Sequence, residues 1–158
     1  MAWQEDMVPL LRGLINDLDS STYSDSTLEQ YIVYAAHFNI NEISFDTTYT
    51  IDMSQMSITP NPTSPQDLSF INLTVLKAAI FVLRGEVKEA TAQSVRVVDG
   101  PSSMDFTGVY KAKIALLKMM EEDFGNAKLS AALGDLSVGL AILSPYTQEG
   151  IRSDGFRV

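Results

Sequence analysis

The sequence predicts a mainly α-helical protein: a bundle of about four helices with a small β element and an extended C-terminal segment. Three observations support this class. Apolar residues recur at helical spacing over most of the chain, their period changes to two in one stretch, and the composition shifts to Ala, Leu, Ser and Gly near the C-terminus. With 158 residues, 46% of them hydrophobic and 20% charged, the chain fits one domain with a single core. We assign residues 1–126 to a helical core with a β insertion around 43–60, and residues 127–158 to a C-terminal extension.

A short first helix is predicted after Pro9, because a proline is tolerated in the first turn of a helix but disrupts its interior. The apolar positions that recur there at helical spacing are Leu11, Leu14, Ile15 and Leu18. The polar run 17–22 is predicted to end the helix. This run begins like a calcium-binding loop, but Thr22 stands where such a loop needs glycine and Leu28 where it needs glutamate. We therefore interpret it as a linker between helices.

The second helix has two possible starts. Ser24 can cap it, with Tyr23 and Leu28 as a hydrophobic staple, or Ser26 can cap it, with Glu29 completing a capping box. The sequence leaves both registers open. The apolar stripe that this helix is predicted to lay on a core consists of Leu28, Tyr31, Ile32, Ala35 and Phe38.

One or two strands follow, because apolar and polar residues alternate there with a period of two. The apolar positions are Tyr49, Ile51, Met53, Met56 and Ile58. Prolines at 60, 62 and 65 supply no amide donor and end the strands.

The longest helix is predicted from Pro65 to about Glu89, with Ser64 as N-cap and Asp67 in the first turn, where the helix dipole favours an acid. Its length would be roughly 35 Å. Apolar residues cover more than one of its faces, which predicts a central position in the bundle.

A strand-like run at 94–98 ends at a turn, 99–101, and a last amphipathic helix follows. Ser103 or Asp105 can cap this helix, and we expect Gly125 and Asn126 to stop it. Residues 121–123 are all acidic and predict a solvated face or contact with a basic neighbour. Lys111, Lys113 and Lys118 are spaced for solubility or for pairing with an acidic neighbour.

Acidic residues dominate the charge. Eleven Lys and Arg stand against 20 Asp and Glu, which gives a formal net charge of −9. Residues 1–76 hold ten acids and one base, Arg12, whereas residues 77–158 hold ten of each. A phosphate-binding surface would work against this field, so free nucleic acid is a poor partner. The apolar stretches fall short of the ~20 residues that a membrane span needs, which predicts a soluble protein made in a cytoplasm.

Few residues suit catalysis. The chain has no Cys and one His, and His37 has no acid or second His four residues further on. No nucleophile elbow, phosphate-binding loop or dinucleotide fingerprint occurs. We predict no enzymatic activity, no cofactor and no metal site. A small enzyme using two carboxylates stays open as an alternative, because a sequence does not show which of 20 acids lie close together.

The order of these pieces resembles the head-to-tail connector, or neck adaptor, proteins of tailed bacteriophages. The resemblance rests on the run 17–25 followed by Leu28 and an amphipathic helix, on a long helix ending near Ala90, on the strand and turn at 94–99, and on residues 104–106 opening a last helix up to Phe124. It covers roughly residues 8–126. The chain departs from leaner members of that family by its strand-rich and proline-rich stretch 43–65.

This resemblance implies a virion structural protein in the phage neck. It implies a closed ring of identical subunits, a dodecamer, between the portal protein and the next neck or tail component, with DNA in transit through a channel. The acidic N-terminal half would suit a channel wall that repels DNA. In this family the C-terminal extension reaches onto the portal, which implies the same for residues 127–158. The predicted portal-binding residues are Leu136, Leu140, Ile142, Leu143, Tyr146 and Phe156. A head-completion or tail-completion protein is the alternative of the same kind.

Overall fold

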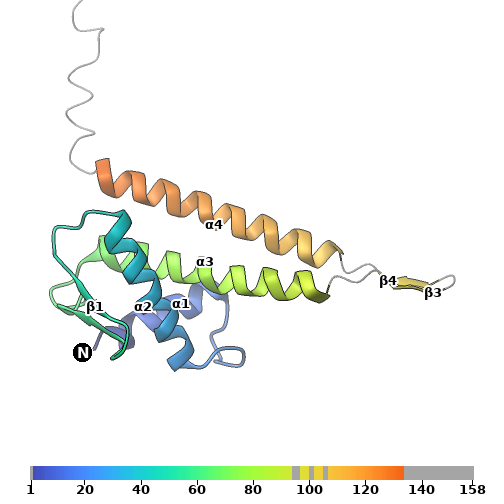
Figure 1. Cartoon of the computed structure of the whole chain (residues 1–158), viewed down its shortest axis with the longest axis horizontal. Helices are drawn as coiled ribbons and strands as arrows, with labels where there is room; N and C mark the ends of the chain where they lie inside the picture. Colours follow the sequence, from blue (N-terminus) through green and yellow to red (C-terminus); the bar gives the residue numbers. More distant parts are fainter. Residues whose placement is uncertain (1, 94–96, 100–101, 105–106, 134–158) are drawn as a thin grey trace, which may run out of the picture.

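The computed structural model describes residues 2–93, 97–99, 102–104 and 107–133 (Figure 1). In chain order the elements are α1 (Trp3–Ile15), α2 (Asp25–Glu42), β1 (Thr50–Asp52), β2 (Ser57–Thr59), α3 (Leu68–Gln93), β3 (Val97–Asp99), β4 (Ser102–Met104) and α4 (Thr107–Leu133). The mainly helical class is confirmed: four helices dominate, and the strands form two antiparallel pairs, β1–β2 and β3–β4. Residues 134–158 of the predicted extension lie outside the described residues.

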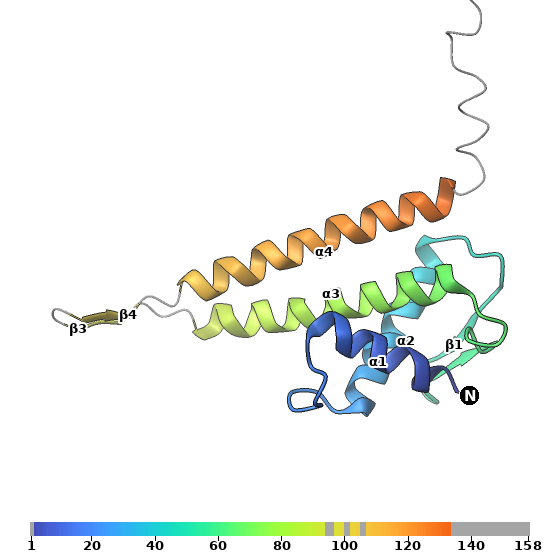
Figure 2. The same cartoon turned by 180° about the vertical axis from the view of Figure 1, so that it is seen from behind.

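α3 is the central helix, as its wide apolar arc predicts. α4 runs alongside it, while α1 and α2 pack on the part of its surface that α4 leaves open (Figures 1 and 2). The fully buried side chains of Phe70 and Val82 belong to this helix. Removing such side chains from water is the main stabilising contribution to a bundle of this kind.

The expectation that no segment is long and apolar enough to cross a membrane is wrong for α3. Residues Leu68–Ala92 meet that test by length and composition, with a mean hydropathy of 1.6 over their most apolar stretch. Here the helix packs against the three other helices, and the central helix of a packed domain has the same apolar character.

α1 begins earlier than predicted. It starts at Trp3, so Pro9 lies inside the helix and not in its first turn. An interior proline forfeits one backbone hydrogen bond. Burial of Trp3, Met7 and Leu11 on one face of α1 offsets that loss. The helix ends at Ile15, and its C-cap Asn16 has a positive φ of 57° and donates its backbone amide to the carbonyl of Arg12.

α2 begins in the first of the two predicted registers. Ser24 is the N-cap, and its hydroxyl accepts a hydrogen bond from the Thr27 amide at 3.3 Å. The alternative with Ser26 as cap is not adopted. Further along the helix, the buried Asn39 amide donates to the buried Thr74 hydroxyl of α3 at 3.4 Å, which links the two helices inside the core.

The predicted strands form the hairpin β1–β2, in which Ile51 lies opposite Ile58. α3 then begins at Leu68, later than predicted, and its N-terminal cap is Asp67 instead of Ser64. The Asp67 carboxylate accepts the Phe70 amide at 2.9 Å and the Tyr49 hydroxyl at 2.8 Å. This one side chain therefore caps α3 and ties the β insertion to it.

α4 extends further than predicted, because it continues through Gly125 and Asn126 to Leu133. The first seven residues of the predicted extension, 127–133, are thus helical. Lys128, which lies among them, forms an ion pair with Glu42 of α2 at 3.4 Å. The predicted cap Ser103 lies in β4, and the other candidate, Asp105, lies outside the described residues.

Candidate interaction surfaces

The linker between α1 and α2 is held by a buried ion pair. The Arg12 guanidinium donates to the Asp17 carboxylate at 2.8 Å and to Asp25 at 2.6 Å. Asp17 also accepts the backbone amides of Thr22 and Tyr23, each at 3.0 Å. Burial opposes the charge on Asp17, but these amides and Arg12 outweigh it and hold the pKa of Asp17 below its usual value. The interpretation of this run as a helix linker is confirmed, because both carboxylate oxygens of Asp17 accept hydrogen bonds from Arg12 and from the linker backbone.

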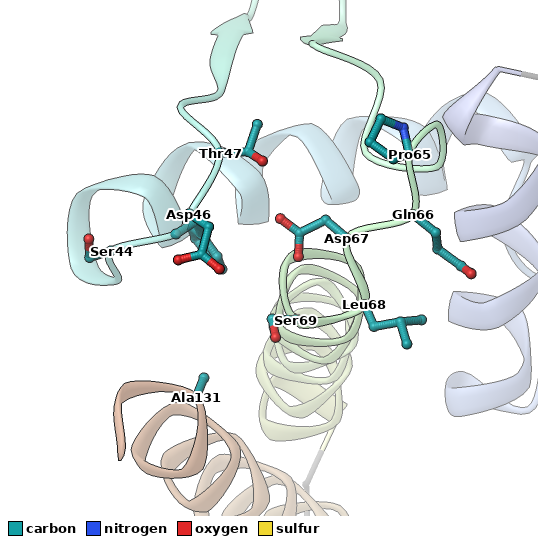
Figure 3. A pocket seen from close by; sticks show the side chains of 10 residues that line it. Ser44, Asp46, Thr47, Pro65, Gln66, Asp67, Leu68, Ser69 and Ala131 are labelled. Atoms are coloured by element: carbon teal, nitrogen blue, oxygen red, sulfur yellow. The ribbon is translucent and has the colours of Figure 1, made fainter. Parts of the chain in front are cut away.

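A hollow of about 380 Å³ lies where α3 begins, between residues 44–47 and 65–69, with Ala131 of α4 at its edge (Figure 3). Asp46 and Asp67 face it from opposite walls. Both oxygens of Asp67 are already engaged, one by the Phe70 amide and one by the Tyr49 hydroxyl. Burial together with Asp67 raises the pKa of Tyr49 to about 12. Asp67 is therefore a capping and anchoring group, and the hollow does not pair it with Asp46 for acid–base work.

Exposed apolar side chains form a row on α1. Leu10 and Leu14 are four residues apart on one helix face, and they are 49% and 48% exposed. Asp6 precedes Leu10 by four residues and is also exposed, so the row reads acid, leucine, leucine. We call Asp6, Leu10 and Leu14 the α1 row.

α4 carries a comparable row on the surface that it turns away from α3. Lys111, Ala115 and Met119 are spaced by four residues and are all exposed, Met119 to 54%. Leu116, 42% exposed, lies beside them. We call Lys111, Ala115 and Met119 the α4 row; it reads base, alanine, methionine. Contiguous apolar side chains left in water commonly mark a surface that binds a partner.

A third exposed apolar pair lies on α2. Tyr34 and Phe38 are four residues apart, and Phe38 is 51% exposed while its ring meets Phe81 of α3 edge-on at 5.6 Å. His37 is exposed beside Phe38, so this histidine is a surface residue.

Phe38, predicted on the core stripe of the second helix, is exposed, and so are Leu14 and Leu18 among the apolar positions of the predicted first helix. Two apolar rows lie on α1, a buried one through Trp3, Met7 and Leu11 and an exposed one through Leu10 and Leu14, while Leu18 lies in the linker beyond the helix. The predicted helix began after Pro9 and therefore did not include Trp3 and Met7 of the buried row. The tryptophan at position 3 was the signal that could have revealed it, because a residue this large usually lies in a core or an interface.

Some residues of the predicted charged clusters on the last helix form ion pairs with α3, and the others are exposed. Glu121 pairs with Arg84 at 2.7 Å, and Lys113 pairs with Glu86 at 3.0 Å, so both contribute to the α3–α4 contact. Lys111, Lys118 and the remaining acids of residues 121–123 are exposed. Within the described ranges, no group of three or more His, Asp or Glu is arranged to hold a metal ion.

The six predicted portal-binding residues, from Leu136 to Phe156, lie outside the described residues. Comparison with protein-family models, with characterised proteins and with solved structures finds no match to this chain.

Proposed function

We propose that this protein is a neck adaptor of a tailed bacteriophage: a virion structural protein whose copies form a ring on the portal and join the head to the tail. DNA passes through the ring without being held. In this proposal the described bundle supplies the contacts between copies, and the chain beyond α4 supplies the contact with the portal.

The observation that carries the proposal is the pair of exposed apolar rows on α1 and α4. A chain of this size with a closed core does not need leucine and methionine side chains half exposed on two different helices. Such surfaces are typical of a subunit that buries them in an assembly. The residue order of the chain, which resembles the adaptor family, selects the phage neck among possible assemblies.

The charge distribution also supports a channel. Residues 1–76 have ten acids against one base, and a wall of that sign avoids the phosphate contacts that would hold DNA. A head-completion or tail-completion protein would share this character, and it would bind a tail component in place of a portal.

The experiment measures binding of the full-length protein to purified phage portal proteins and to tail-terminator proteins. A variant with Leu140→Ser, Leu143→Ser and Tyr146→Ser is expected to bind the portal at least about tenfold more weakly, because buried apolar anchors carry most of the energy of an interface. Leu18→Ser, at a linker residue 75% exposed, is the matched control and should bind as the unaltered protein does. Unchanged portal binding by the triple variant, or binding to the tail terminator alone, contradicts the proposal.

A further inference from the structure

We propose that the α1 row of one copy packs against the α4 row of the next copy. Asp6 would then lie against Lys111, and Leu10 and Leu14 against Ala115, Leu116 and Met119. This deepens the proposed function, on which it rests, by naming the two faces that join neighbouring subunits.

The two rows match in length and in order. Each row places three residues at intervals of four, so each spans about 12 Å of helix. Each begins with a charged residue toward its N-terminus and continues with apolar residues. Rows of residues four apart are the ridges by which two helices interdigitate. When α1 and the neighbouring α4 lie parallel, Asp6 lies opposite Lys111 and the leucines of α1 lie opposite the apolar residues of the α4 row.

The charges on the two rows are complementary. α1 exposes Glu5 and Asp6, whereas the exposed charged residues within the length of the α4 row are Lys111 and Lys118; the exposed acids Glu122 and Asp123 follow the row. The other α4 lysines are engaged within the chain, Lys113 with Glu86 and Lys128 with Glu42. No ion pair between described residues involves Lys111 or Lys118. An acidic surface with exposed leucines is therefore the partner that the α4 row fits, and α1 provides one.

A second copy is the occupant because the chain carries both halves of the contact. α1 and α4 each pack on α3, and the two have no substantial contact with one another (Figure 2). A contact between the two rows is therefore a contact between molecules. A contact between two different surfaces is heterologous: each copy presents its α1 row to one neighbour and its α4 row to another, and the series closes into a ring when the rotation permits.

Cross-linking tests the pairing directly, because the chain has no native cysteine. The full-length protein carrying both Leu10→Cys and Ala115→Cys is treated with a short bis-maleimide at high concentration and also after mixing with portal. A ladder of products extending beyond the dimer is expected. The matched control carries Leu10→Cys and Leu68→Cys, since Leu68 is 58% exposed and lies outside both rows; it should give at least about tenfold less product. Equal cross-linking of the control, no product, or a product that stops at the dimer overturns the pairing.

Charge reversal provides a second arm. Asp6→Lys and Lys111→Asp are each expected to reduce the yield of the ladder at least about tenfold, because like charges then face one another, and the two changes together should restore it to within about threefold. Asp46→Lys, an exposed acid in the loop after α2, is the control for the change in net charge and should leave the yield unaltered. Failure of the double variant to recover overturns the pairing.

Portal binding measured on the same samples separates the two proposals. A ring on the portal without the α1–α4 cross-link means that the row pairing is wrong and the adaptor role stands. The cross-linked ladder without portal binding means that the pairing stands and the adaptor role is wrong.

Discussion

Replacing Gly125 with alanine tests whether α4 is continuous. The structure places Gly125 inside α4, exposed, with nothing within 4 Å of the position that a Cβ would occupy. Alanine there loses less conformational freedom on folding than glycine and meets no neighbour. The expected result is a gain of about 0.5 to 1 kcal/mol in the free energy of unfolding. Had the helix ended at this glycine in a left-handed conformation, alanine would instead cost about 1 to 2 kcal/mol.

The assay is urea unfolding followed by circular dichroism at 222 nm. With a denaturant dependence of about 2 kcal/mol per molar, the midpoint should rise by about 0.3 to 0.5 M. Gly13→Ala in α1 is the matched control, because Gly13 also has nothing within 4 Å and should shift the midpoint in the same direction. A midpoint that falls for Gly125→Ala while it rises for Gly13→Ala would refute the continuous α4 and return residues 127–133 to the extension.

Three further predictions concern stability. Hydrogen-bonding and charged partners hold the pKa values of Asp17 and Glu42 below their usual 3.8 and 4.5. The contribution of these two carboxylates to the free energy of unfolding is therefore complete above the usual values and is lost as the pH falls through the lowered ones. Urea midpoints that stay constant from pH 7 to pH 3 would argue against these ion pairs. Burial raises the pKa of Tyr23 and of Tyr49 from 10.0 to about 12. The free energy of unfolding should therefore decline as the pH rises from 10 to about 12, and absorbance at 295 nm should show two tyrosines that ionise late. Simultaneous ionisation of all tyrosines near pH 10 would contradict this prediction. Phe70→Ala empties a fully buried position that stacks on Tyr49 at 3.9 Å and should cost about 3 to 5 kcal/mol in urea unfolding; a cost near zero would place Phe70 outside the core.

The helices and the β1–β2 hairpin could be predicted because their signals are local. Periodicity shows the apolar stripe of α2 and the wide arc of α3, and alternation shows Ile51 and Ile58. The Ser24 cap was one of two local candidates, and the structure selects it. Local sequence therefore determined which elements form, while their ends depended on contacts between elements.

The start of α3 and the end of α4 show why. Ser64 and Asp67 are both good caps by residue type, and the hydroxyl of Tyr49, distant in sequence, engages Asp67. Gly125 and Asn126 are good stop signals, but Phe124 is buried on one side of them and Lys128 bonds to Glu42 on the other, so packing carries the helix through. Neither partner is visible in the local sequence.

The candidate surfaces depend on the same kind of information. Sequence spacing placed Leu14 and Phe38 on apolar stripes, and both are exposed, because periodicity shows that a stripe exists and does not show which residues of it are buried. The α1 and α4 rows depend on which side chains the folded bundle leaves exposed.

Electron microscopy of the full-length protein, alone and mixed with purified portal particles, tests the central claim most directly. The expected result is rings of this protein seated on one end of the portal, with α1 of each copy beside α4 of the next. A tail-terminator protein that binds its own partner at the same concentration is the control. Single particles of this protein, together with portals that all remain bare, would contradict the adaptor role.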